Sequence, residues 1–119
     1  MATFSKTILS GSTDGKGILV AATSSPGTVI HTGSVTAATL HEVWIYAVNY
    51  DTTDRKLTLQ WGGQTAGTDD IEYTVKAENG LYLVAPGLLI KGNATPLVIR
   101  AFAALGTAIV VHGYVNVIA

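Results

Sequence analysis

Hydrophobic and polar residues alternate along this chain in short runs, a pattern typical of β-strands that bury one face. The clearest run is Leu40–Tyr50, in which Val43 and Ile45 share one side while Trp44 and Tyr46 share the other. Gly, Pro, Asn and Asp separate the runs, and no stretch of ten residues has helical periodicity. Strands are predicted over residues 3–9, 18–23, 28–32, 40–50, 56–61, 71–77, 81–85, 88–91, 97–104 and 108–118.

The last predicted strand, within Ala108–Ala119, is apolar on both faces, whereas a strand covered on one side alternates apolar and polar residues. One parity carries Ile109, Val111, Val115 and Val117, and the other carries Val110, Tyr114 and Ile118, with His112 and Asn116 between them. In a chain too short for a third layer, we expect another copy of the molecule to cover the second face. Leu97–Ala104 is expected to pair with this strand as a hairpin, which would give one two-strand apolar patch.

Turn signals suggest how the other strands pair. Asp51–Asp54 is expected to close a hairpin, and Asn79-Gly80 suits a type I′ turn because both central residues of that turn need positive φ. Pro86-Gly87 is expected to end the strand over residues 81–85, before a short strand over residues 88–91. The sequence therefore predicts an all-β fold: an antiparallel, jelly-roll-like β-sandwich of about eight to ten short strands with no substantial helix. Residues 1–12 are expected to form an N-terminal arm or edge strand, and residues 13–119 a single sandwich domain.

Composition narrows the classes of function. Charged residues make up 13% of the chain, about half the usual share of about 25%, which leaves a neutral surface that is easily desolvated by another protein. The net charge of −1 lacks the excess of positive charge that is typical of proteins that bind nucleic acid. Cysteine is absent, which excludes disulfides and thiolate sites. The first residues lack a secretory pattern and no apolar run is long enough to span a membrane, so synthesis in a cytoplasm is expected.

The titratable residues form no recognisable catalytic motif. His31, His41 and His112 lie on three separate predicted strands, without the spacing of a zinc site, and are expected at the surface or at an interface. Asp69-Asp70 and the Asp51–Asp54 segment lie in loops, where Asp commonly bonds its own backbone. We predict no enzyme activity and no catalytic, cofactor-binding or metal-binding residues, with a loop-bound calcium ion as the open alternative.

Three aromatic residues allow two interpretations. Trp44, Tyr46 and Tyr114 could stack on sugar rings from an exposed sheet face, or they could belong to the core or to a subunit contact. We favour the second interpretation. Arg100 is expected on the outer face of its strand, beside His112 and Tyr114 if the last two strands pair. It would lie there either at an interface, where arginine and tyrosine are both enriched, or exposed to solvent.

The chain resembles small cysteine-free β-proteins of tailed bacteriophages, the capsid decoration (cement) proteins and related head or tail accessory proteins. The resemblance rests on Leu40–Asn49, on Pro86-Gly87-Leu88 and on the closing run Val111–Val115. It implies a jelly-roll-like sandwich, usually trimeric, that sits on the capsid exterior and clamps neighbouring subunits of the major capsid protein. The resemblance implies no individual binding residues.

We therefore expect a non-enzymatic structural protein of the virion that binds itself and the capsid, without nucleic acid, membrane or cofactor. A carbohydrate- or receptor-binding module of a phage tail or fibre is the alternative, and a ring-forming tail protein is another. The residues expected at a subunit or capsid interface are Phe4, Trp44, Tyr46, Val98, Arg100, Phe102, Val110, His112, Tyr114 and Ile118.

Overall fold

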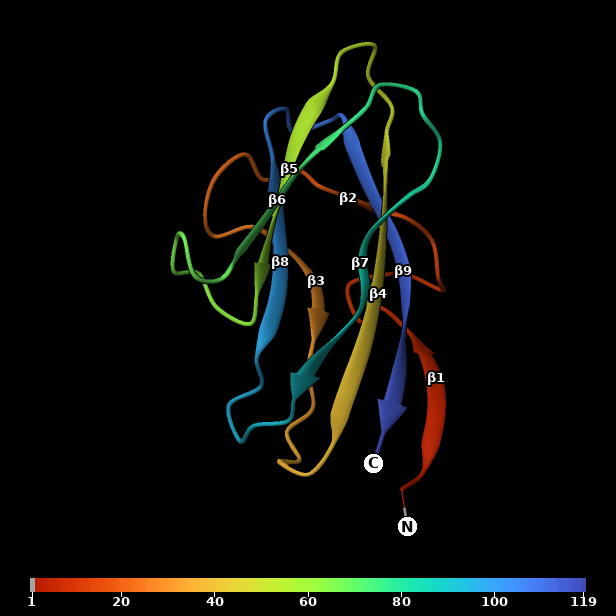
Figure 1. Cartoon of the computed structure of the whole chain (residues 1–119), viewed down its shortest axis with the longest axis vertical. Coiled ribbons are helices and arrows are strands. Elements are labelled where there is room, and N and C mark those ends of the chain that lie inside the picture. The colour runs from red at the N-terminus through yellow and green to blue at the C-terminus, as the bar shows by residue number, and fades with distance from the viewer. Residues whose placement is uncertain (1) are drawn as a thin grey trace.

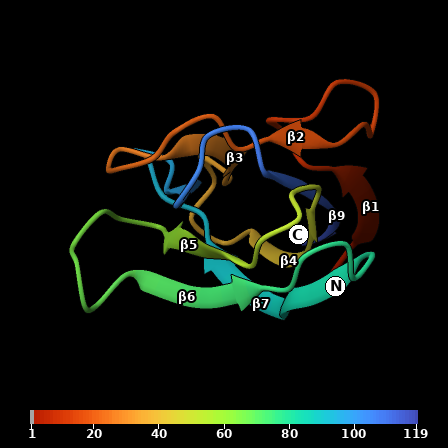
Figure 2. The same cartoon turned by 90° about the horizontal axis from the view of Figure 1, so that it is seen from above.

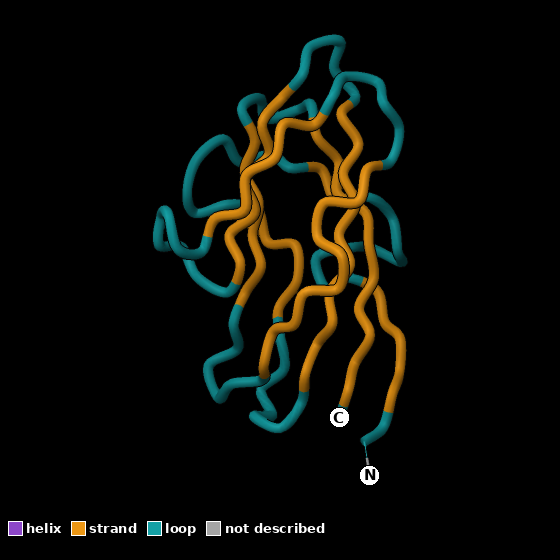
Figure 3. The backbone as a smooth tube through the Cα atoms, in the orientation of Figure 1, coloured by secondary structure: helices purple, strands orange, loops and turns teal. Residues whose placement is uncertain are grey.

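The computed structural model describes residues 2–119, which form two antiparallel β-sheets packed face to face (Figure 1). These residues contain strands, turns and loops but no helix (Figure 3). Sheet 1 has the order β1 (Phe4–Ile8), β9 (Ile109–Ile118), β4 (Leu40–Asn49) and β7 (Tyr82–Lys91), and the short β2 (Ile18–Leu19) also pairs with β9. Sheet 2 has the order β3 (Thr28–Thr32), β8 (Val98–Ala103), β5 (Arg55–Trp61) and β6 (Asp70–Val75).

This strand order is that of a jelly roll. When the two-residue β2 is set aside, the strands of sheet 1 follow one another as β1-β9-β4-β7 and those of sheet 2 as β3-β8-β5-β6. Successive strands mostly alternate between the sheets, which nests one Greek key around another. The predicted fold class, an antiparallel jelly-roll-like sandwich, is confirmed.

Three predicted hairpins are wrong. β4 and β5 lie in different sheets, and the same holds for β6 and β7 and for β8 and β9. Within the described residues, β5 and β6 are the consecutive strands that pair directly. Each strand has a core face that either sheet can bury, so a turn signal fixes where the chain reverses without fixing whether it crosses to the other sheet.

The predicted break at Pro86-Gly87 is also wrong, because β7 runs through it with register shifts against β4. β7 is an edge strand, where a proline without N–H removes no ladder hydrogen bond. Gly87 has φ +72°, and a Cβ there would lie 3.0 Å from the Trp44 ring. The glycine thus permits both the backbone conformation and the close approach of the indole.

The core lies between the two sheets. The largest fully buried apolar side chains are Leu9, Ile30, Ile45, Leu57, Leu59, Ile99 and Ile109. β1 differs from the other long strands because all five of its residues are exposed, so it extends sheet 1 beyond the cover of sheet 2. The chain returns to the core directly afterwards, at Leu9, and the Gly11 N–H bonds the carbonyl of Ile30 at 2.9 Å.

Both ends of the chain lie at the same end of the sandwich (Figure 1). There the backbone N–H of Ala119 bonds the carbonyl of Thr3 at 2.9 Å, which continues the pairing of β1 with β9. Seen along the long axis, β6 and β7 close one edge of the sandwich (Figure 2). Tyr73 and Tyr82 stack across this edge with ring centroids 4.5 Å apart.

Candidate functional site on the outer face of sheet 1

The outer face of sheet 1 consists of the side chains on β1, β9, β4 and β7 that point away from the core. On β4, Val43, Ile45 and Ala47 are fully buried, and the residues between them face outward. The strand register aligns the outward side chains in rows across the sheet. Successive rows hold Phe4, Ile118, Leu40 and Lys91; Lys6, Asn116, Glu42 and Leu89; Ile8, Tyr114, Trp44 and Pro86; His112, Tyr46 and Leu83; and Leu19, Val110 and Val48.

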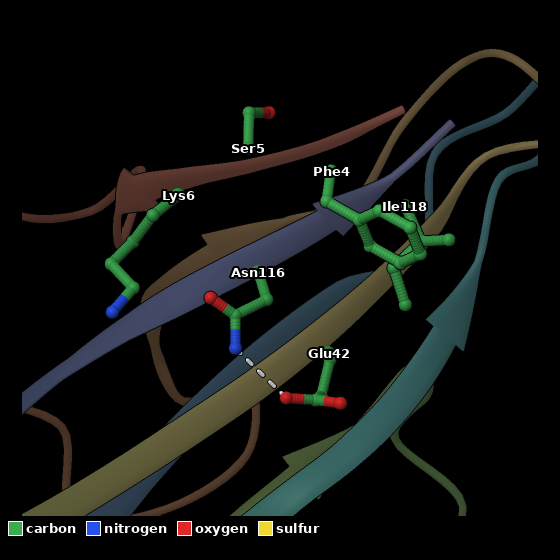
Figure 4. A pocket seen from close by; sticks show the side chains of 6 residues that line it. All are labelled: Phe4, Ser5, Lys6, Glu42, Asn116 and Ile118. Carbon is green, nitrogen blue, oxygen red and sulfur yellow. Dashed lines mark hydrogen bonds between the residues drawn. The ribbon is translucent and has the colours of Figure 1, made fainter. Parts of the chain in front are cut away.

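Glu42 is fixed at the centre of the polar row. Its Oε1 accepts hydrogen bonds from Trp44 Nε1 at 2.7 Å and from Asn116 Nδ2 at 2.9 Å (Figure 4). These bonds favour the ionised form, so the hydrogen bond from Asn116 and then that from Trp44 lower the pKa of Glu42. The result is a charged, oriented carboxylate on a face that is otherwise largely apolar and aromatic.

Lys6 lies in the same row on the opposite side of β9. Its ammonium group is 4.8 Å from the centroid of the Tyr114 ring, within the range of a cation–π contact. In Figure 4 its side chain extends away from Glu42. The polar row therefore carries a cation and an anion separated by one intervening strand.

A shallow hollow of about 350 Å³ lies over this row. Figure 4 shows the ring of Phe4 beside Ile118 at one side of the hollow, with Asn116 and Glu42 below. Phe4 is 72% exposed, and Ser5 and Lys6 complete the lining. The hollow combines an apolar wall with a carboxylate, an amide and an ammonium group, which is a chemistry suited to protein or sugar contacts.

The aromatic row is internally packed. Trp44 and Tyr114 stack with their planes 9° apart and their centroids separated by 6.0 Å, and the backbone of Gly87 lies close to the indole. Such stacked pairs add about 0.5–1.5 kcal/mol beyond their buried area. The row is consequently held in place before any partner arrives.

The structure divides the residues that the sequence predicted for one interface. Seven of them lie on the outer face of sheet 1: Phe4, Trp44, Tyr46, Val110, His112, Tyr114 and Ile118. The other three, Val98, Arg100 and Phe102, lie on the outer face of β8 in sheet 2. The single two-strand patch is therefore wrong, because β9 pairs with β1, β2 and β4 and not with β8. Its role as an interface stays a prediction for each face separately.

Arg100 keeps its predicted place on the outer face of β8 but lies far from His112 in the fold. Its Nη1 donates to the carbonyl of Gly27 at 3.4 Å. It also lines a second hollow of about 300 Å³, together with the loops at 62–64 and 93–97. Sheet 2 thus has its own half-buried cation.

Sequence reasoning missed Lys6 and Glu42 as site residues. The parity of 40–50 already places Glu42 beside Trp44, so that signal was present in the strand pattern. The position of Lys6 depends on the pairing of β1 with β9, which no local pattern gives.

His31 is buried, and does not lie at the surface or at an interface as the sequence suggested; it pairs with the half-buried His41. His31 is 3% exposed, and its Nε2 lies 2.8 Å from Nδ1 of His41. Nδ1 of His31 accepts the backbone N–H of Ser10 at 3.0 Å, so the neutral ring carries its proton on Nε2 and donates it to His41. Burial first, and then the nearby His41, lower the pKa of His31 to about 4, and burial also lowers the pKa of His41.

The loop carboxylates hold loops together. Asp51 pairs with Arg55 at 2.6 Å, and Asp69 Oδ2 accepts the backbone N–H of Thr65 at 3.0 Å. Asp54 Oδ1 likewise accepts the N–H of Ala77 at 2.9 Å. Among residues 2–119, no three His, Asp or Glu side chains gather where they could hold a metal ion.

Comparison of the sequence with models of known protein families found no match, and comparison with curated proteins found none either. In the part of the chain that the structure describes, no helix is long and apolar enough to cross a membrane.

Proposed function

We propose that this protein is a non-enzymatic structural component of a virus particle, a capsid decoration protein that stabilises the shell by binding to itself and to the major capsid protein. The observation that carries the proposal is the outer face of sheet 1. Its rows of apolar and aromatic side chains extend over four strands, and they include the exposed apolar side chains of Phe4, Ile8, Leu19 and Leu89. The apolar and aromatic part of such a face is stabilised when a protein surface removes it from water.

The size of this face suits a protein contact. With strands about 4.8 Å apart and side-chain rows about 6.8 Å apart, four strands and five rows span about 600 Å². Two such surfaces bury about 1,200 Å² together, the lower limit for a stable interface. Assembly through this face leaves the outer face of β8, with Arg100, free for the shell.

A carbohydrate-binding module is the second candidate, because one observation favours it. The hollow over the polar row places the Glu42 carboxylate and the Asn116 amide near Trp44 and Tyr114. Carboxylates, amides and aromatic rings are the groups that orient and stack on sugars. The internal stacking of the two rings leaves less open ring surface for a sugar, so we rank this candidate second.

Binding to shells tests the proposal. Purified tailed-phage capsids that lack accessory proteins are incubated with the protein, and co-sedimentation and the melting temperature of the capsid are measured. We expect saturable binding that raises the capsid melting temperature, because a ligand that binds only the assembled shell stabilises it. Arg100→Glu is expected to weaken binding, whereas Lys76→Glu, the same charge change in an exposed loop, is not.

A glycan array provides the competing outcome. Binding of defined glycans that is lost in Trp44→Ala, together with no binding to any capsid, would replace the decoration function with the carbohydrate-binding one. If Arg100→Glu and Lys76→Glu both bind capsids as well as the wild type does, the decoration function still holds, but the shell contact does not lie on β8.

A further inference from the structure

We propose that two copies of this chain pair face to face through the outer face of sheet 1, about a two-fold axis parallel to β9, so that Lys6 of each copy meets Glu42 of the other. The inference rests on the proposed assembly function and names the partner at that face as a second copy.

The first argument is the unpaired charge on this face. Within residues 2–119, the ion pairs are Arg55 with Asp51 and Lys56 with Glu72, so Glu42 forms no ion pair with any of these residues. Its Oε1 is used by two hydrogen bonds. Burying a carboxylate without a cation is unfavourable, so a partner that brings a positive group to Glu42 is favoured over one that does not.

The second argument is that the face itself carries that group at the right place. At Asn116, β9 lies between β1 and β4, and Lys6 and Glu42 both lie opposite this residue. They are two strand spacings apart, about 10 Å, which explains why they do not pair within the chain. A rotation by 180° about an axis along β9 exchanges their positions and places each Lys6 over the Glu42 of the other copy.

The same rotation matches the other outward residues of β1, β9 and β4, while β7 has no counterpart and lies outside the contact. Phe4 comes over Leu40 of the second copy and Ile8 over Trp44, while Tyr114 meets its own counterpart near the axis. Apolar side chains therefore meet apolar or aromatic ones, and the long side chains of Lys6 and Glu42 meet across sheets packed about 10 Å apart.

The charges also select this axis over the other one in the plane of the interface. Rotation about an axis that runs across the strands would place Lys6 on Lys6 and Glu42 on Glu42. Like charges opposed at an interface cost several kcal/mol. A two-fold contact uses the same surface on both copies, so it ends with two copies. The row of Lys6 and Glu42 therefore predicts dimers, whereas the resemblance to decoration proteins implies trimers.

Charge reversal tests the pairing. Light scattering after size exclusion should give the wild type a mass twice the chain's 12.4 kDa. Lys6→Glu and Glu42→Lys are each expected to raise the dissociation constant at least tenfold, and the double variant to restore it. An equimolar mixture of the two single variants should form heterodimers, because one carries two anions and the other two cations.

The matched control is Lys56→Glu, the same charge change on sheet 2, which should leave the dimer intact. Circular dichroism establishes that each variant is folded. Glu42→Gln removes the charge yet keeps an oxygen that can accept from Trp44 and Asn116, and is expected to weaken the dimer less than Glu42→Lys.

Three results would overturn the inference: a monomeric wild type at 100 µM, a trimer, or folded single variants whose double combination does not recover pairing. These outcomes are separate from those of the proposed function. Capsid binding by a monomer would refute only the dimer, whereas a charge-dependent dimer that binds no capsid would support the pairing and refute the decoration function.

Discussion

The buried His31, paired with His41, predicts that this fold loses stability in mild acid. His31 has a folded-state pKa of about 4, against about 6.5 in an unfolded chain. Above pH 6.5 both states are neutral and the stability is fully present. Between pH 6.5 and 4 the unfolded chain binds a proton that the folded chain excludes, so stability falls as the pH falls.

The size of the loss follows from the two pKa values. The full difference corresponds to about 3 kcal/mol, and the part lost between pH 7.5 and pH 5 is about 2 kcal/mol. Protonation of His41 adds to it in the same direction, since its pKa is also lowered. If His41 is protonated, its Nδ1–H faces the Nε2–H of His31. If His31 is protonated, its Nδ1–H faces the backbone N–H of Ser10, which the neutral ring accepts at that nitrogen.

Urea unfolding at pH 7.5 and at pH 5.0 measures the effect, and stopping at pH 5 keeps the titration of carboxylates small. His31→Gln is expected to reduce stability at pH 7.5 but to abolish most of the difference between the two pH values. His112→Gln removes an imidazole outside the pair and serves as the matched control. The reasoning is refuted if wild-type stability differs by less than about 0.5 kcal/mol between the two pH values, or if His31→Gln retains the wild-type difference.

Three further predictions concern buried polar and backbone contacts. Gln60→Leu removes the acceptor of the Gly27 N–H and should cost about 1–3 kcal/mol in urea unfolding; equal stability would show that water replaces the contact. Asn49→Ala removes two hydrogen bonds within the loop after β4 and one to Val75 of β6, and should cost about 2–3 kcal/mol and speed proteolysis between residues 50 and 54, with Asn93→Ala as the exposed control. Gly113→Ala places a Cβ against the carbonyl of Trp44, and should lower the melting temperature by several degrees, as expected for about 1–3 kcal/mol of overpacking.

The strands could be predicted from the sequence because each carries its own signal. The parity of Leu40–Tyr50 put Val43 and Ile45 on one side of the strand, and the structure buries both fully. Alternation depends only on which side of one strand is covered, so it needs no knowledge of the neighbours. Sheet membership is different, because it depends on which face the chain covers after each turn. The Asn79-Gly80 turn therefore indicated a reversal correctly but led to a false hairpin.

The candidate site could be predicted only in part, for the same reason. Trp44, Tyr46 and Tyr114 were identified from their strands, but their arrangement as rows comes from the register of β4 with β9. The partnership of Lys6 with Glu42 requires that register and also the pairing of β1 with β9. The buried His31–His41 contact joins strands of opposite sheets, and nothing local in either strand indicates it.

β9 is apolar on both faces, and this still indicates a contact on its outer face although the strand beside it is β4 and not β8. Its odd-numbered residues Ile109, Val111 and Val115 are buried in the core, whereas Tyr114 and Ile118 on the other parity are only half-buried. One chain thus covers one face of the strand and leaves the other to solvent. Because β4 and not β8 lies beside β9, that uncovered face gains Trp44 and Glu42, and with them both an aromatic row and a charge. A neutral apolar face could meet any apolar surface, but one that holds Lys6 and Glu42 symmetrically about β9 excludes most orientations of a partner. The charges that make the face less apolar are what make its pairing specific.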